Sequence, residues 1–467
     1  MDRRAFLRAL AAAGGLALLP GAVGAGARVP AAAGRPRTGA AAIPDPIGFV
    51  RTRWADDPWT RGSYSYLPVG ARPADRRDLA AAIAGRLWIT GEATDADAPS
   101  TVHGARAAGL RSAGGVFAAA GAGERVIVVG AGISGLACAR ALRAGGMEVR
   151  VLEASGRVGG RLRTVRRAGW GMPLELGASW VEDVTASPLE TVLDDLGVAT
   201  APFDWDRHLL VDGAGDRVAR PQATWVAPAA AAVRAAVRWA DVRDPDRSLA
   251  AALAGSGAAA TVDPAILRHY LETEIAAEYA ASASTLSAGW GQEEGSVGPD
   301  RIVLGGYDRI ARAWARGLDV RLHTPVTAIA RDATGVTVTE AAGGTHRAER
   351  VVVSVPLGVL KAGTIAFVPE LPAGHRRAIA TLGMGLLDKL WLRFAEPWWS
   401  GGARFWTRAA APGIPWIEWI DLRPFTGEPV LLALTGGEVA RAWTARSDAD
   451  HLAAAMASLR AFASAGA

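Results

Sequence analysis

Three stretches in the middle of the chain differ in their hydrophobic period and therefore predict different elements. Residues 126–129 form a short continuous apolar run, which is typical of a strand buried on both faces of a parallel sheet. Apolar positions at 136–142 then predict a helix, and residues 148–152 predict a second buried strand. The order strand, helix, strand predicts an α/β unit with a parallel sheet.

A glycine-rich turn joins the first predicted strand to the helix. Gly130, Gly132 and Gly135 have the spacing Gly-x-Gly-x-x-Gly. A side chain at either of the first two would keep a pyrophosphate away from the unpaired N–H groups at the helix N-terminus. Glu153 ends the second strand, where a carboxylate can accept hydrogen bonds from an adenosine ribose. The combination predicts a dinucleotide site, and the alternative is a fortuitous glycine-rich turn.

Motifs on both sides of this turn resemble those of flavin-containing amine oxidases. Residues 155–164 combine glycines and arginines as in the family's second motif, and residues 177–182 are similar to its next landmark. The other similar segments are 53–54, 57–59, 62–65, 91–94, 101–105, 305–307, 351–360 and 382–389. The resemblance covers residues 43–459 and is nearest to the polyamine oxidase and lysine demethylase group.

The resemblance implies a bound FAD rather than NAD. The residues at the family's cofactor-binding positions are Gly130, Gly132, Ser134, Gly135, Glu153, Arg157, Gly160, Arg161, Gly177, Ala178, Ser179, Trp180, Val326, Glu92 and Val102. Glu92 is expected to accept hydrogen bonds from the ribityl hydroxyls, and the N–H of Val102 to face the pyrimidine oxygen of the flavin. The one cysteine, Cys138, lies in the helix after the glycine turn and not at 62–65, so FAD is expected to be non-covalent.

The same resemblance implies how an amine is oxidised. Lys389, in a segment that alternates like a strand, matches a lysine that holds a water against flavin N5. Tyr64 matches one wall of an aromatic cage, and Thr101 stands where monoamine oxidases place a second aromatic residue. The expected reaction transfers hydride to N5, hydrolyses the imine to an aldehyde or ketone, and returns the electrons to O2 as H2O2. A cage open on one side favours polyamines and other secondary amines.

Further residues are expected to contact the substrate. These are Glu182, Trp54 and Trp59. The glutamate matches an acid that receives a distant ammonium in plant-type polyamine oxidases, and the tryptophans line the cavity unless they belong to the core. A helix is predicted at 265–280, with Glu274 and Glu278 on one face. We expect that face to be a solvated surface rather than a second acidic site.

The order of the motifs differs from that of the family. Segments 91–94 and 101–105, which normally end an amine oxidase, precede the glycine turn, so the chain resembles a circular permutation. The predicted fold is a Rossmann-like FAD-binding domain with a mixed sheet plus an α+β substrate domain. Its new ends would lie between a helix near 451–462 and a strand near 49–54, and a gene rearranged by error is the alternative.

The expected domains alternate along the chain. FAD-binding residues are 54–183, made of a permuted part at 54–112, a linker at 113–124 and a dinucleotide fold at 125–183, together with 300–361. Substrate-domain residues are the entering strand 43–53, 184–299 and 362–467. A signal peptide is expected at 1–27 and a disordered spacer at 28–42.

The first 27 residues resemble a twin-arginine export signal. Arg3 and Arg4 precede an apolar run that is too short to span a membrane, and Ala25-x-Ala27 offers a cleavage site. The twin-arginine export machinery carries folded proteins, so we expect a periplasmic or secreted flavoprotein without stable membrane insertion. A basic amphipathic N-terminus is the alternative.

Composition narrows the classes of function. The net charge is +5 and acidic residues are interspersed with basic ones, so the sequence shows no basic patch typical of nucleic-acid binding. The 7 histidines do not have the spacing of metal ligands. Lys361 and Lys389 are the two lysines, and the first is interpreted as a turn residue. Two alternatives stay open: an L-amino acid oxidase, which needs an arginine clamp for a carboxylate, and a flavin-binding protein left inactive by its rearrangement.

Overall fold

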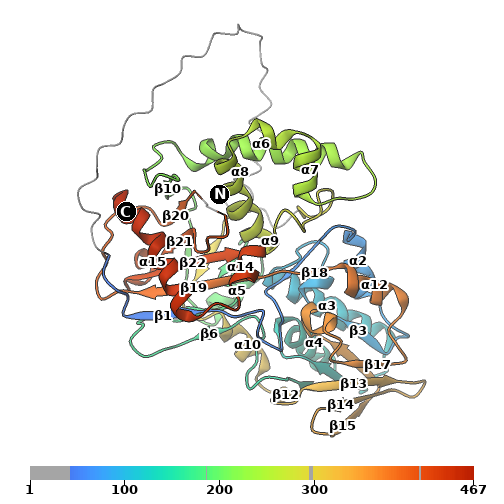
Figure 1. The fold of residues 1–467 in the computed structure, drawn as a ribbon. Helices are drawn as coiled ribbons and strands as arrows, with labels where there is room; N and C mark the ends of the chain where they lie inside the picture. Colours follow the sequence, from blue (N-terminus) through green and yellow to red (C-terminus); the bar gives the residue numbers. More distant parts are fainter. Residues whose placement is uncertain (1–42, 186, 294–297, 410–411) are drawn as a thin grey trace.

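A five-stranded parallel sheet carries the glycine turn (Figure 1). Its strands, in spatial order, are β12 (Asp319–Arg321), β5 (Glu148–Leu152), β4 (Arg125–Val129), β16 (Arg350–Val353) and β3 (Leu87–Ile89). Each neighbouring pair is parallel, and the two predicted strands are β4 and β5. The structure is a computed structural model that describes residues 43–185, 187–293, 298–409 and 412–467. The predicted signal peptide and spacer lie outside the described residues.

Segments that precede the glycine turn complete this sheet. β3 pairs with β16 through Trp88 and Val352, and β16 pairs with β4 through Val352 and Val128. The chain therefore reaches the sheet edge first and the central strand β4 afterwards. The FAD-binding part is built from residues on both sides of the turn.

Two helices that pack on each other cover the sheet beside β4. They are α3 (Val102–Ala119) and α4 (Ile133–Ala144). The predicted linker at 113–124 is wrong over most of its length, because α3 continues to Ala119. Its alanines favour helix, and a Cβ at Gly115 would lie 2.7 Å from the indole nitrogen of Trp88, so the second half of the helix packs on β3. The connection to β4 is only residues 120–124, of which 121–123 are exposed.

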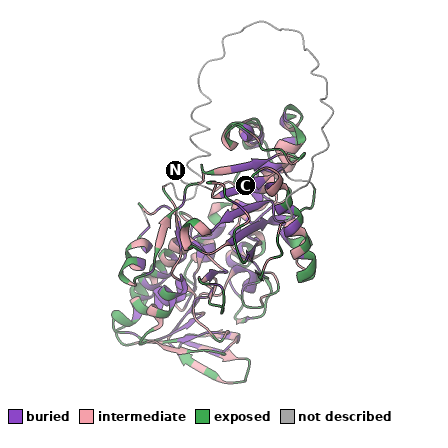
Figure 2. Cartoon of the chain, turned by 90° about the vertical axis from the view of Figure 1, so that its left-hand side faces the viewer, coloured by how far each residue is buried: buried purple, intermediate pink, exposed green. Residues whose placement is uncertain are grey.

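A six-stranded sheet forms the centre of the other part of the molecule. Its strands, in order, are β1 (Gly48–Arg51), β19 (Leu387–Arg393), β22 (Val430–Gly436), β21 (Glu418–Asp421), β20 (Phe405–Arg408) and β10 (His208–Val211). β1 is the predicted entering strand and pairs antiparallel with β19. The central strands β19, β22 and β21 are almost entirely buried, and purple strands run through the interior of the molecule in Figure 2; β19 carries Lys389 into this interior.

Helices near the six-stranded sheet correct one expectation. They are α6 (Gln222–Asp241), α7 (Leu249–Gly255), α8 (Pro264–Tyr270), the π-helical turn η3 (Leu271–Ala276) and α9 (Ala277–Tyr279). The predicted continuous helix at 265–280 is interrupted by η3, whose wider turn changes which residues share a face. Glu274 is buried and accepts a hydrogen bond from Gln222 at 3.2 Å. The expectation of a solvated surface is therefore wrong for Glu274.

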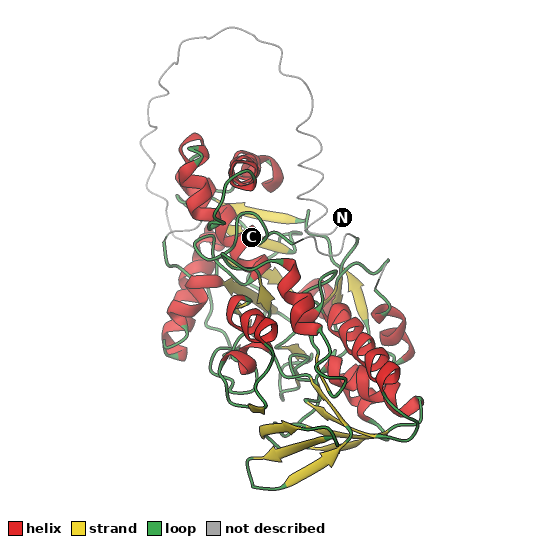
Figure 3. Cartoon of the chain, turned by 90° about the vertical axis from the view of Figure 1, so that its right-hand side faces the viewer, coloured by secondary structure: helices red, strands yellow, loops and turns green. Residues whose placement is uncertain are grey.

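Further strands and helices complete the fold, and Figure 3 shows the helices in red and the strands in yellow. The strands are β2 (Ser65–Tyr66), β6 (Thr164–Val165), β7 (Leu174–Glu175), β8 (Trp180–Val181), β9 (Thr200–Pro202), β11 (Arg301–Val303), β13 (Val326–Arg331), β14 (Val336–Glu340), β15 (Thr345–Ala348), β17 (Ala366–Val368) and β18 (Gly383–Met384). The helices are α2 (Pro73–Ala80), η1 (Glu92–Thr94), α5 (Leu189–Asp195), η2 (Ala258–Thr261), α10 (Asp308–Ala315), α11 (Leu357–Lys361), α12 (Ala373–Thr381), α13 (Arg423–Thr426), α14 (Gly437–Trp443) and α15 (Asp448–Ser464). None of the described helices combines the length and apolarity needed to cross a membrane.

The first and last described residues lie in the same hydrophobic cluster. Ile43 and Ala467 both pack against the buried residues around Trp399. The start of α15 is tied to the end of β1, because Asp448 accepts a hydrogen bond from Arg51 at 2.7 Å. The helix therefore runs from the end of β1 back toward the cluster in which the described chain begins.

Candidate active site

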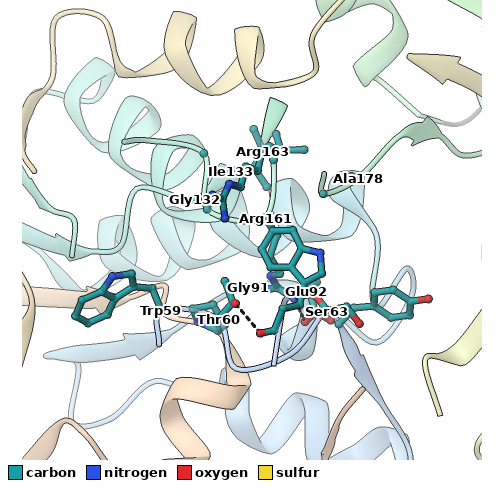
Figure 4. Close-up of a pocket in the computed structure, with 18 of the residues that line it drawn as sticks. Trp59, Thr60, Ser63, Gly91, Glu92, Gly132, Ile133, Arg161, Arg163 and Ala178 are labelled. Carbon is teal, nitrogen blue, oxygen red and sulfur yellow. Dashed lines mark hydrogen bonds and ion pairs between the residues drawn. The ribbon is translucent and has the colours of Figure 1, made fainter. Parts of the chain in front are cut away.

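A cavity of about 590 Å³ is lined by residues of both large sheets. Val129 of β4 lies at one part of its wall, and Lys389 of β19 and Leu434 of β22 at another. Every residue that the sequence predicts for the site lines this cavity except Gly135. Figure 4 shows how residues from before the glycine turn, such as Gly91 and Glu92, stand beside Gly132 and Arg161.

The glycines shape a narrow cradle at the cofactor end. Gly130 has φ +103°, which only glycine adopts readily. A Cβ added to Gly160 would lie 3.4 Å from the Cα of Gly132, so the two turns approach each other closely. A Cβ on Gly132 would meet no protein atom within 4 Å, so its space opens into the cavity. At Gly135 a Cβ would lie 2.1 Å from the carbonyl oxygen of Gly130. Gly135 thus serves the packing of α4 on the turn, which explains its absence from the wall.

Polar groups at this end fit an FAD molecule. The hydroxyl of Ser354 is buried, lines the cavity and has no hydrogen-bond partner among the described residues. Glu153 ties the turn together by accepting hydrogen bonds from the N–H of Ala131 at 2.7 Å and the hydroxyl of Ser155 at 2.7 Å. A buried hydroxyl and an anchored carboxylate suit the polar edge of an adenosine, and the ribose contact of Glu153 stays a prediction.

Glu92 is the centre of a buried charge network. It accepts hydrogen bonds from Arg161 at 2.7 Å and from Ser65 at 2.6 Å, and Arg76 donates to the same Ser65 at 2.7 Å. Burial acts to raise the pKa of the Glu92 carboxyl, but Arg161 and Arg76 outweigh it and hold that pKa below its ordinary value. Glu92 is therefore ionised at neutral pH, and its contact with ribityl hydroxyls stays a prediction.

Lys389 is buried in the cavity wall beside residues 177–179. Its ammonium donates hydrogen bonds to the carbonyl oxygens of Gly177 at 2.6 Å and Glu175 at 3.3 Å and to the hydroxyl of Ser179. Burial lowers the pKa of Lys389 to about 7, although the nearby Glu175 acts to raise it. Burial in turn raises the pKa of the Glu175 carboxyl to about 7, against hydrogen bonds from Thr164 and Tyr307. A lysine in the cavity wall that changes charge near neutral pH can supply either an ammonium or an amine.

Aromatic residues line the same cavity as Lys389. Tyr64 lines the cavity, and its hydroxyl is fixed by the carbonyl oxygens of Ala277 and Glu278 at 3.0 and 3.2 Å. Trp54 is 4% exposed and Trp59 40% exposed, so both line the cavity but only Trp59 reaches its rim. All three predicted residues therefore line the cavity, and their contacts with a substrate stay predictions.

Thr101 has a structural contact that its predicted role did not include. Its hydroxyl caps α3, accepting a hydrogen bond from the N–H of Gly104 at 3.0 Å and donating one to Ala98 at 2.8 Å. The cap fixes the helix N-terminus at the cavity, where Val102 also lies. The open-cage position of Thr101 stays a prediction.

The structure adds three residues that motif matching missed. Glu278, Asp300 and Trp205 line the cavity together with the predicted Glu182. The sequence predicts a solvated surface for Glu278, because the hydrophobic period does not reveal the π-helical turn. Asp300 and Trp205 lie in no family motif, and only the pairing of β11 with β8 and β9 brings them to the wall.

The parallel sheet, the glycine cradle and a cavity ending at a buried lysine define a dinucleotide-binding enzyme of the flavoprotein class. The chain belongs to the flavin-containing amine oxidoreductase family, whose model matches residues 31–116 and 133–466. It is 32% identical over 354 residues to polyamine oxidase 4 of Oryza sativa subsp. japonica, across 72% of each chain. It is 33% identical over 350 residues to polyamine oxidase 2 of Arabidopsis thaliana, across 68% of this chain and 70% of the relative.

A solved structure agrees with these relatives. Putrescine oxidase bound to putrescine has a TM-score of 0.58 and 25% identity, with 73% of this chain and 81% of that chain covered. The protein is accordingly an FAD-dependent amine oxidase with non-covalent FAD. No group of three or more metal-ligating side chains occurs among the described residues.

Proposed function

We propose that the protein oxidises a polyamine or another secondary amine with O2 as the acceptor, releasing H2O2 and an aldehyde or ketone. The observation that carries this proposal is the distribution of charge in the cavity. The arginines Arg157, Arg161 and Arg163 line the cavity in the cofactor motifs, beside the acids Glu92 and Glu153, whereas Glu182, Glu278 and Asp300 are further lining acids and Lys389 is the one lining cation of the described residues outside those motifs. An anionic pyrophosphate and a cationic amine have complementary surroundings in such a cavity.

The chain's own residues bind and orient the amine. FAD, when bound, supplies the acceptor for the hydride of the α-carbon and passes the electrons to O2. Trp54, Trp59 and Tyr64 give an apolar wall that excludes water, and Glu182 receives a distant ammonium. Lys389 donates hydrogen bonds beside the reacting carbon, and its positive charge stabilises the anion that builds up as oxygen is reduced. Because the pKa of Lys389 is about 7, its side chain is an ammonium below neutral pH and becomes an uncharged amine above it.

The lining residues favour an amine over an L-amino acid. A carboxylate clamp requires an arginine free to form a bidentate pair. Among the described lining residues, Arg161 is paired with Glu92, Arg163 lies 3.6 Å from Asp57, and Arg157 donates to the carbonyl oxygen of Gly160. Each arginine is thus engaged by the protein at the cofactor end.

Purified protein tests the reaction directly. Peroxide release is measured with spermidine, phenylethylamine and L-amino acids, and flavin bleaching is followed anaerobically with the same compounds. We expect spermidine to bleach the flavin and release peroxide, and L-amino acids to do neither. Peroxide released with L-amino acids alone would show that the protein is an L-amino acid oxidase. A yellow protein that no compound bleaches would show that it binds flavin but is inactive.

We also propose that the motif order is a circular permutation. Elements from residues 87–119 lie against β4, β16 and α4 as the family's final motifs require, and the ends of the described chain share one cluster. The rice and Arabidopsis polyamine oxidases align with 72% and 68% of this chain, as expected when only the part after the joint follows their order. This explanation predicts that the original order can be restored, as argued in the Discussion.

Export by the twin-arginine machinery is a separate proposal. It rests on Arg3, Arg4 and the apolar run, which lie outside the described residues. Cell fractionation of the full chain and of an Arg3→Lys, Arg4→Lys variant tests it. The parent protein should appear outside the cytoplasm with FAD bound, and the variant should stay inside. Equal export of both would contradict the proposal.

A further inference from the structure

We propose that Ser179 is a positioning residue that lets Lys389 exist in the cavity either as an ammonium or as an uncharged amine. The inference rests on the proposed function and concerns how one lysine serves both halves of that reaction. A positive charge favours the anion that forms as oxygen is reduced, whereas an uncharged side chain does not repel a cationic amine entering the cavity. Both side chains are buried in the cavity wall.

Lys361 and Lys389, the two lysines of the chain, differ in one hydrogen-bond partner. The acceptors of Lys361 are the backbone carbonyl oxygens of Ile379, Ala380 and Leu382. Those of Lys389 are the carbonyl oxygens of Glu175 and Gly177, at 3.3 and 2.6 Å, and the hydroxyl of Ser179. A carbonyl oxygen only accepts hydrogen bonds, whereas a hydroxyl can accept and donate. The three partners of Lys361 therefore suit only an ammonium, and those of Lys389 suit an ammonium or an amine.

Both charge states of Lys389 can keep their hydrogen bonds. As an ammonium, Lys389 donates to all three partners, and the hydroxyl of Ser179 donates in turn to the carbonyl oxygen of Glu175 at 3.2 Å. As an amine, Lys389 keeps its two bonds to carbonyl oxygens, and the hydroxyl turns its proton toward the lone pair of Nζ. The two states differ by one proton, exchanged with water in the cavity, and by the direction of one hydrogen bond. Neither state leaves a buried donor unpaired, which would be costly.

Glu175 is the neighbouring charge that acts on Lys389. Burial lowers the pKa of Lys389 to about 7, and Glu175 acts to raise it. The carboxyl group of Glu175 accepts hydrogen bonds from Thr164 at 2.6 Å and from the N–H of Tyr307 at 3.1 Å, which hold β7 against the start of α10. The other titratable groups on the surrounding elements and in the cavity wall are Arg51, Glu182, Glu278, Asp300, Asp308 and Asp388. The charge of Lys389 therefore depends on its burial, on Glu175 and on the hydroxyl of Ser179.

The experiment reads the charge of Lys389 by NMR of protein labelled with carbon-13 at the lysine Cε. Two lysines give two signals, which Lys361→Met and Lys389→Met assign. The FAD-loaded protein is titrated without an amine, and the Lys389 signal of the parent should have its midpoint at about 7. Ser179→Ala leaves a buried ammonium one acceptor short, which costs more than an unpaired amine lone pair. Its Lys389 midpoint should therefore fall by about one pH unit or more.

Two further variants serve as controls. Ser179→Thr keeps the hydroxyl and should restore the parental midpoint. Ser63→Ala removes another buried hydroxyl of the cavity wall, which accepts a hydrogen bond from the N–H of Leu387 on β19 at 2.8 Å. Because the Nζ of Lys389 donates to Ser179 and not to Ser63, the midpoint should stay unchanged in this variant. The absorbance of bound FAD checks each variant, and apoproteins are titrated instead if one of them loses FAD.

Reoxidation of the flavin provides a second measurement that needs no amine. FAD reduced with a stoichiometric amount of dithionite is mixed with O2, and the rate is followed against pH. The rate of the parent should fall as Lys389 loses its charge, and in Ser179→Ala this fall should begin about one pH unit lower. The inference is overturned if Lys389 has the same midpoint in Ser179→Ala as in the parent, or if Ser179→Thr behaves like Ser179→Ala. A parent flavin that no amine bleaches would instead refute amine oxidation, while the lysine titration still judges Ser179.

Discussion

The two ends of the cavity are built from different parts of the chain. The cofactor end is shaped by backbone, with Gly130, Gly132 and Gly160 bringing the turns together, and its charged lining groups include arginines. The amine end is shaped by side chains, and Lys389 lies there among acids and indole rings. One cavity therefore offers opposite charges to a pyrophosphate and to an amine.

This difference separates what a short motif can specify from what only the fold can. Glycine positions at the cofactor end act locally, because a missing Cβ affects the next turn of the chain. At the amine end, Asp300 and Glu182 come from segments more than a hundred residues apart and meet only through β8 and β11. Substitutions should therefore have effects of different kinds at the two ends.

The largest expected effect comes from closing the cradle. Gly132→Val places a side chain in space that no protein atom occupies, so the apoprotein should keep its melting temperature and lose FAD. Gly135→Ala places a Cβ against the carbonyl of Gly130 and should cost about 1–3 kcal/mol of unfolding free energy. Absorbance of bound FAD and thermal unfolding of apoprotein measure the two effects. Retained FAD in Gly132→Val would show that no cofactor enters the cradle.

The same distinction explains which elements and site residues could be predicted from the sequence. β4, β5, the helix α4 and the cradle residues follow from apolar runs and glycine spacing, which act over a few residues. The end of α3 was missed because Gly114 and Gly115 suggested a linker, whereas the packing of Gly115 on Trp88 favours a helix. Glu278 and Asp300 were missed because a π-helical turn and a strand pairing leave no local pattern.

The next effect distinguishes the two lysines. Lys389→Met removes an ammonium from the cavity wall and should slow flavin turnover by about 10²–10³-fold with the FAD spectrum unchanged. Lys361 instead donates to the carbonyl oxygens of Ile379, Ala380 and Leu382 at the end of α12. Lys361→Met should cost about 0.3–1 kcal/mol of stability and leave turnover unchanged. Stopped-flow spectra measure flavin turnover in the two variants, and urea unfolding measures their stability. Normal turnover in Lys389→Met would show that Lys389 takes no part in the mechanism.

A smaller effect should appear in the pH dependence of stability. Burial lowers the pKa of Lys389 from 10.5 to about 7, so between these values the unfolded chain binds a proton that the folded chain does not. The free energy of unfolding contributed by Lys389 therefore rises with pH across this window. Glu175, with its pKa raised from 4.5 to about 7, binds its proton in the folded state, so its contribution falls between pH 4.5 and 7. Urea unfolding should show the parent apoprotein gaining stability relative to Lys389→Met as pH rises from 7 to 10, because the penalty for burying the lysine fades, and parallel curves would contradict this.

The smallest expected effect comes from restoring the family's chain order. A chain that begins at Arg125, continues through Ala467 and is joined by a short linker to Ile43 opens the exposed connection at 121–123 and leaves both ends of the cavity intact. Because loop closure changes by only about 0.6 kcal/mol for each doubling of loop length, its FAD affinity and turnover should match those of the parent. FAD titration of the apoprotein and peroxide assays compare the two chains. A colourless or insoluble rearranged chain would show that the present order is required to form the cavity.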